Sequence, residues 1–199
     1  MHAIRRWWQA LCVACMAALL WPASAWAQDS GWSLGVYGGP YYDTEPAGFL
    51  NGRAGYKDQY LLALTASKTL WKSESWPLAL ELDGMVGQQW GQASLQEVAL
   101  VPVLRWSGFP WNEHLQTAVR AGPIGLSYTT AISPLERGPD GRGSQWLSFL
   151  MLEVAVAPPQ EKSWEVFVRL HHRCTIYDRL NDYGANGEDF VALGWRRKF

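Results

Sequence analysis

The chain has 199 residues, of which 48% are hydrophobic and 18% are charged, and its formal net charge is −1. This near balance of charge excludes the strongly basic composition of a protein that binds nucleic acid or holds a membrane through a polybasic patch. The length is that of a single domain preceded by a leader segment.

The N-terminus has the three parts of a secretory signal peptide. Arg5 and Arg6 precede an apolar run over residues 7–20, and Ala25-Trp26-Ala27 follows. The run is short for a membrane-spanning helix and ends in a cleavage motif, so the pattern predicts a signal peptide over residues 1–27. Its removal takes away two of the 17 basic residues and no acidic one, which leaves 15 basic against 18 acidic residues.

The positions of the three cysteines exclude a redox motif and an internal disulfide in the mature chain. Cys12 and Cys15 lie inside the predicted signal peptide, so their C-x-x-C spacing is not a redox motif. The mature chain keeps Cys174 alone and forms no internal disulfide.

The mature chain shows the two-residue period of β-strands and almost no helical period. Several segments exceed the usual five or six residues of soluble sheets and suit the roughly 9–11 residues that cross a bilayer. The predicted strands lie near residues 31–41, 59–72, 76–90, 94–107, 114–129, 145–157, 163–174 and 189–199.

The connections between these strands alternate in length. Short ones are expected at 73–75, 108–113 and 158–162, and long polar ones at 42–58, 130–144 and 175–188; only 91–93 breaks the pattern. Short turns at one end and long loops at the other are typical of bacterial outer-membrane barrels. Residues 28–199 are therefore predicted to form an all-β, eight-stranded antiparallel transmembrane barrel in the outer membrane.

The two faces of the predicted strands differ in character. One face is apolar, with residues such as Leu80, Leu100 and Val154. The other carries charges of both signs, which we interpret as ion pairs in a lumen filled by side chains: Glu81, Asp83, Glu97, Arg105, Arg120, Glu153, Glu165 and Arg169. A soluble barrel of the lipocalin type would turn its apolar face inward, and it is the alternative architecture.

A possible chemical site lies at the ends of the last two strands. His172 and Cys174 continue the apolar face of one strand, and Asp189 lies on the corresponding face at the start of the next. A thiol beside an imidazole is a nucleophile beside its base. His171 points to the opposite face, so the two histidines do not share a metal ion, and no metal or cofactor is predicted.

The segment Leu170-His171-His172-Arg173-Cys174, together with the closing strand up to Phe199, resembles the outer-membrane lipid A 3-O-deacylases, also labelled acyloxyacyl hydrolase-like. Strict similarity covers about the last thirty residues. In that family a strand ends in a His-x-Ser pair, and an acidic residue lies near the start of a last strand that ends in an aromatic residue. His172 matches the histidine, Cys174 stands in place of the serine, and Glu188 or Asp189 matches the acid.

The resemblance implies a carboxylic ester hydrolase whose substrate is lipid A of lipopolysaccharide in the surrounding outer-membrane lipid. Thr175 stands where the family has an asparagine near the oxyanion. The alternative is a catalytically inactive structural or lipid-binding barrel. Side chains alternate between the two faces of a strand, and this alternation places Asp189, rather than Glu188, on the face of His172. Asp189 is therefore favoured as the acid, although a bulge at the start of the strand would exchange the two residues. The acyl chain removed and the state of assembly, monomer or homodimer, remain open.

The loop before the last strand invites one other interpretation. Asp178, Asn181, Asp182, Asn186 and Glu188 are oxygen donors that calcium could use. Solvated loop polarity explains them equally well and is commoner.

Overall fold

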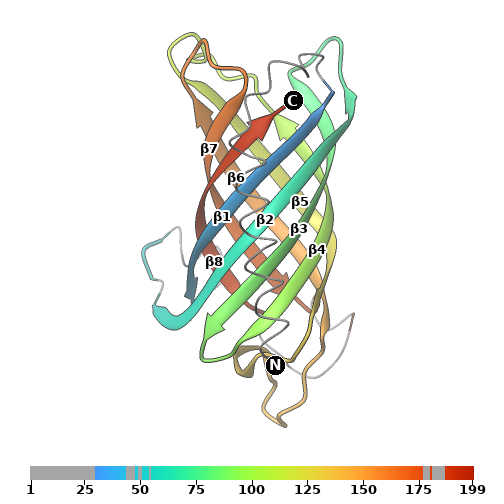
Figure 1. The fold of residues 1–199 in the computed structure, drawn as a ribbon, viewed down its shortest axis with the longest axis vertical. Coiled ribbons are helices and arrows are strands. Elements are labelled where there is room, and N and C mark those ends of the chain that lie inside the picture. The colour runs from blue at the N-terminus through green and yellow to red at the C-terminus, as the bar shows by residue number, and fades with distance from the viewer. Residues whose placement is uncertain (1–29, 44–47, 49–50, 54, 177–179, 181–186) are drawn as a thin grey trace, which may run out of the picture. The chain divides into compact units, whose positions relative to one another are not determined.

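The computed structural model of the protein describes residues 30–43, 48, 51–53, 55–176, 180 and 187–199. Within the unit Gly31–Lys198, eight strands pair in sequence order into a closed antiparallel barrel (Figure 1). The strands are β1 (Trp32–Tyr42), β2 (Tyr56–Lys72), β3 (Leu78–Gly91), β4 (Leu95–Trp106), β5 (Gln116–Thr129), β6 (Trp146–Ala157), β7 (Trp164–Cys174) and β8 (Asp189–Lys198).

The barrel closes through the pairing of the first strand with the last. β1 pairs with β2 on one side and with β8 on the other, with Val36 opposite Leu64 and Trp195 respectively. Closure gives every strand two partners and leaves no sheet edge exposed, which is the condition for crossing a bilayer with strands. The predicted all-β, eight-stranded antiparallel barrel is confirmed.

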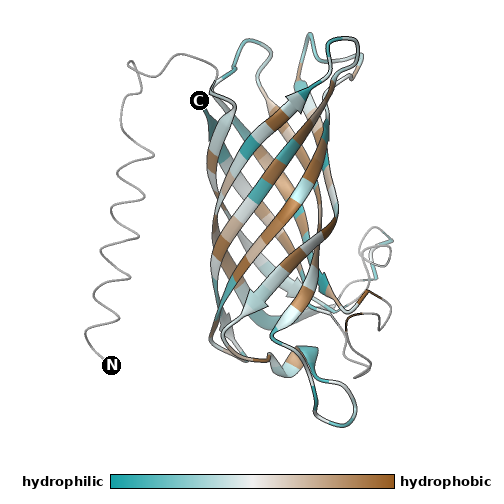
Figure 2. Ribbon diagram, turned by 90° about the vertical axis from the view of Figure 1, so that its right-hand side faces the viewer, coloured by the Kyte–Doolittle hydropathy of each residue, from teal (hydrophilic) through white to brown (hydrophobic). Residues whose placement is uncertain are grey.

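The outer face of the barrel is apolar and exposed, with Leu193 at 69%, Leu100 at 53% and Val86 at 49% of their full accessibility. The hydropathy colours of Figure 2 accordingly alternate along the strands. A soluble protein would not expose apolar side chains on every strand, so this surface faces lipid. The lipocalin-like inversion weighed above is therefore wrong.

Aromatic side chains mark the two ends of the apolar outer face. Trp71, Trp76 and Trp111 are exposed at the end of the short turns, as expected for an interfacial girdle. Tyr60 and Trp90 stack with ring centroids 6.0 Å apart at the end of the long loops. The lipid-facing belt is therefore bounded by aromatic residues at both ends.

Among the residues the structure describes, no helix is both long and apolar enough to cross a membrane.

The predicted charged face lines the lumen and is paired there. Arg120 contacts Glu81, Asp83 and Glu153 at 2.8 to 3.0 Å, and Arg169 bridges Asp83 and Glu153. All of these side chains are almost fully buried. Removing one partner of such a network typically costs about 3–5 kcal/mol, because the remaining charge stays buried and uncompensated.

The lumen also contains an apolar layer that the pattern of charges did not indicate. Tyr37, Phe149, Phe167 and Phe190 are at most 1% exposed and belong to one buried cluster with smaller aliphatic residues. Aromatic rings and charged groups therefore share the lumen, and the Arg169 guanidinium lies 4.5 Å from the centroid of the Tyr37 ring. A small barrel has to fill its interior with side chains, and aromatic rings fill it efficiently.

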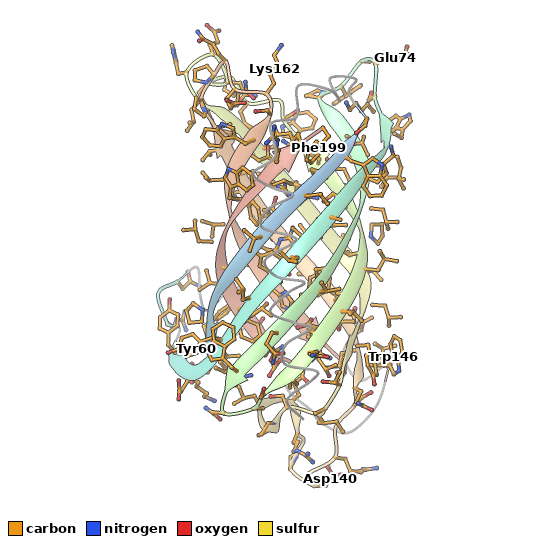
Figure 3. All side chains as sticks on the ribbon, in the orientation of Figure 1. Tyr60, Glu74, Asp140, Trp146, Lys162 and Phe199 are labelled. Carbon is orange, nitrogen blue, oxygen red and sulfur yellow. The ribbon has the colours of Figure 1, made fainter. Side chains whose placement is uncertain are left out.

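The two ends of the barrel differ as the lengths of the connections predicted. Figure 3 places Glu74 and Lys162, from two short turns, at one end and Asp140, from the long β5–β6 connection, at the other. That long connection contains a single 3-10 turn, η1 (Pro134–Glu136), capped by the Ser133 hydroxyl, and the Glu136 side chain is fully buried. The ends of β7 and β8 that carry the candidate site lie at the long-loop end.

Candidate active site

Strand pairing brings the predicted residues into one group on the outer face. Asp189, the first residue of β8, lies opposite His172 in the ladder of β7. On the other side of β7, Leu150 of β6 lies opposite His172, and Ser148 lies opposite Cys174. His172, Cys174 and Asp189 therefore occupy adjacent positions on two hydrogen-bonded strands.

The contact between His172 and Asp189 is short and well shielded. The imidazole Nδ1 lies 2.5 Å from the carboxylate Oδ1, with side chains that are 18% and 8% exposed. A carboxylate accepts and does not donate, so Nδ1 carries the proton and donates it to Asp189. This tautomer leaves the other ring nitrogen, Nε2, free to accept a proton.

The Cys174 thiol lies within hydrogen-bonding reach of the His172 ring, and the backbone N–H of Ile176 donates to the same sulfur. Cys174 is a free thiol of intermediate exposure. Ile176 has φ = 52°, which is unusual for a β-branched residue and marks local backbone strain. The strained turn after β7 therefore orients the Ile176 amide toward the Cys174 sulfur.

Glu188 lies elsewhere, although it is the neighbour of Asp189 in the chain. Its side chain is fully buried in the lumen, where Oε2 lies 3.8 Å from Nη1 of Arg173. Burial raises the pKa of the Glu188 carboxyl above its ordinary value. The β8 ladder already begins at Asp189, so the alternation of the strand separates the two carboxylates onto opposite faces.

The remaining predicted residues fall outside the group or outside the described residues. Thr175 is 6% exposed, and its backbone carbonyl accepts a hydrogen bond from the Leu180 amide at 3.0 Å. His171 points into the lumen as expected, between the Tyr37 hydroxyl and Glu97, each 3.1 Å away. The loop residues weighed as calcium donors lie outside the described residues apart from Glu188, namely Asp178, Asn181, Asp182 and Asn186. In the described part of the chain no group of three or more His, Cys, Asp or Glu residues is arranged to hold a metal ion.

Two residues of the group were not indicated by the sequence pattern. Tyr42, at the end of β1, places its hydroxyl 3.5 Å from Oδ1 of Asp189 and is fully buried. Ile176 contributes its amide through a positive φ. The position of Tyr42 follows from the β1–β8 ladder, and nothing local to Ile176 predicts its conformation.

Comparison with known proteins supports the fold. No protein-family model and no curated protein matches the sequence. The solved structure of the outer membrane enzyme PagL is similar over 84% of this chain and 99% of that one, with a TM-score of 0.57 and 16% identity. Neisserial surface protein A is similar over 85% and 98%, with a TM-score of 0.50 and 10% identity.

The closed barrel, its lipid-facing belt and these likenesses define the class of protein. The chain is an eight-stranded β-barrel of the bacterial outer membrane. The predicted location is confirmed.

Proposed function

We propose that this barrel is an ester hydrolase that removes an ester-linked acyl chain from lipid A, the acylated lipid of lipopolysaccharide, after export by a signal peptide over residues 1–27. One observation carries the proposal: His172 contacts both Cys174 and Asp189, which is the connection that a nucleophile, its base and an orienting acid need. The resemblance of the last thirty residues to the lipid A 3-O-deacylases indicates lipid A as the class of substrate. The similarity in fold to an outer membrane enzyme is compatible with it.

The position of the group suits a lipid substrate. Its side chains lie on the outer face rather than in the lumen, at the end of the barrel with the long loops. In outer-membrane barrels the long loops face the outside of the cell, so this end lies at the level of the outer leaflet. The ester linkages of a lipid in that leaflet would meet Cys174 without passing through the barrel.

The chemistry follows from the geometry in two balanced steps. In the first, the Cys174 sulfur bonds to the ester carbonyl carbon while its proton passes to Nε2 of His172, and the expelled alkoxide then takes that proton. In the second, His172 takes a proton from water as the water attacks the thioester, and the thiolate leaves with that proton. Asp189 holds the ring and stabilises the imidazolium in both steps. The Ile176 amide, which donates to the Cys174 sulfur, stabilises the thiolate that leaves in the second step.

The test compares wild type, Cys174→Ala and Cys174→Ser in cells and as purified protein. Mass spectrometry of lipid A should show the loss of one acyl chain with wild type and no loss with Cys174→Ala. Cys174→Ser should keep part of the activity, because serine with the same base is the family's own nucleophile. All three should form the same folded barrel, because Cys174 faces outward and is not in the lumen core. An unchanged lipid A profile with folded wild type would instead indicate a structural or lipid-binding barrel.

A further inference from the structure

The Tyr42 hydroxyl lies beside the carboxylate of the candidate site. The pairing of β1 with β8 places Tyr41 opposite Phe190, and the next step along both strands brings Tyr42 beside Asp189. Asp189 in turn lies opposite His172 across the β7–β8 ladder. Tyr42, Asp189 and His172 therefore form a row across three neighbouring strands.

The burial of Tyr42 sets it apart from the other outward-facing residues of its strand. Leu34, on the outward face of the same strand, is 39% exposed, whereas Tyr42 is not exposed at all. The register of β1 against β2 shifts between Pro40 and Tyr41, whereas the pairing of β1 with β8 keeps a single register up to Tyr41 and Phe190. A buried tyrosine hydroxyl needs a hydrogen-bonding partner, and Asp189 supplies one.

The same oxygen of Asp189 serves both neighbours. Oδ1 lies 2.5 Å from Nδ1 of His172 and 3.5 Å from the Tyr42 hydroxyl. The tyrosine contact is at the long end of a hydrogen bond, and such contacts in unliganded sites commonly shorten when the substrate binds. A second donor would restrict rotation of the carboxylate and draw charge from the oxygen that orients the imidazole.

We propose that Tyr42 is a positioning residue of this site, which acts through Asp189 to hold His172 in the orientation that serves Cys174. This role rests on the proposed function, because orientation matters only if His172 acts as a base. Tyr42 itself touches neither the sulfur nor the substrate carbonyl in this scheme. Its loss should therefore affect the rate of reaction rather than the binding of the lipid.

The experiment uses Tyr42→Phe with Tyr41→Phe as the matched control. Tyr41 is the adjacent tyrosine, 5% exposed, and its ring packs edge-on against Phe190 in the lumen. With a p-nitrophenyl ester of a medium-chain fatty acid in detergent micelles, Tyr42→Phe should lower kcat about tenfold and leave KM within about twofold. Tyr41→Phe should change neither constant. In an Asp189→Asn background, Tyr42→Phe should have little further effect.

A second readout does not depend on turnover. Cys174 is the one thiol of the predicted mature chain, so its rate of alkylation by iodoacetamide between about pH 5 and 10 reports the ionisation of the Cys174–His172 pair. Tyr42→Phe should move the midpoint of this profile by about half a unit or more, and Tyr41→Phe should not. If the two variants behave alike in both assays, Tyr42 has no positioning role. If wild type does not hydrolyse esters but the midpoint still moves, the proposed function fails while the contact of Tyr42 with the pair stands.

Discussion

Asp189 and Glu188 are neighbours in the chain, and exchanging each for its amide isolates what a carboxylate does beside His172. Asp189→Asn keeps the size of the side chain and removes its charge. The change affects a 2.5 Å contact between groups that are 8% and 18% exposed. Glu188→Gln makes the same chemical change in the lumen, where the carboxylate lies 3.8 Å from Arg173.

The size of the expected loss follows from this geometry. A hydrogen bond to a charged group contributes about 1.5–3 kcal/mol, which corresponds to roughly 10- to 100-fold in rate. An amide also fails to stabilise the imidazolium and can hold the ring in the wrong tautomer, which in other triads brings the total loss to about 10⁴-fold. We expect Asp189→Asn to lower kcat by about 10²- to 10⁴-fold with KM little changed. Glu188→Gln should lower kcat by less than about threefold, because its side chain does not reach the imidazole.

Turnover of the micellar ester and release of fatty acid from purified lipid A provide the assay. The heat-modifiable migration of the folded barrel provides the check that both variants are native. Equal losses in the two variants would show that charge in this region matters only through stability. A larger loss in Glu188→Gln would refute the argument from strand parity and assign the orienting role to Glu188.

Two further predictions concern the surroundings of the site. Gly187→Ala should leave a folded barrel with little activity toward the same ester, because the alanine Cβ would lie 1.7 Å from the carbonyl oxygen of Arg173 and must displace the start of β8. A displacement of about 1 Å can lower the rate about 10²-fold. Turnover equal to that of wild type would contradict this. Burial, with the charge of Glu188 nearby, raises the pKa of Glu136 to about 8 from an ordinary 4.5. Between these values the folded protein holds a proton that the unfolded chain releases, so stability should fall as pH rises, by at most about 1.4 kcal/mol per pH unit. Urea unfolding at several pH values should show this fall, and Glu136→Gln should flatten it; an equal slope in the variant would refute the assignment.

The strands and their faces could be predicted because the period of two residues carries both kinds of information. Once a strand is recognised, the parity of one apolar residue fixes the face of all the others. This is why His172 and Cys174 could be placed together on the outer face, and His171 in the lumen, from the sequence alone. The same alternation places Asp189 and Glu188 on opposite faces, provided that β8 begins as a regular strand at Asp189.

Other features depend on tertiary contacts that no local pattern encodes. The segment over residues 130–144 has the composition of a solvated loop, yet Glu136 turns back into the lumen and pairs with Arg173. Tyr42 reaches Asp189 because the ladder between β1 and β8, two strands far apart in the chain, brings the end of β1 beside the start of β8. The positive φ of Ile176 is a strained conformation that its side chain disfavours. In each case long-range packing decides the position of the residue.

The alternation at the end of β7 also explains how a lipid-facing site can be held firmly. Arg173 lies between His172 and Cys174 in the chain and points into the lumen, where its guanidinium contacts Glu136 and the Ser127 hydroxyl. Its backbone amide donates to the Glu188 carbonyl at 2.9 Å, which fixes the start of β8 beside the end of β7. The contacts of Arg173 therefore hold the backbone of the site from the lumen side, and the opposite face is exposed to lipid. If Cys174 is the nucleophile as proposed, Cys174→Ser on that face should require no repacking of the interior and should change the chemistry of the nucleophile alone.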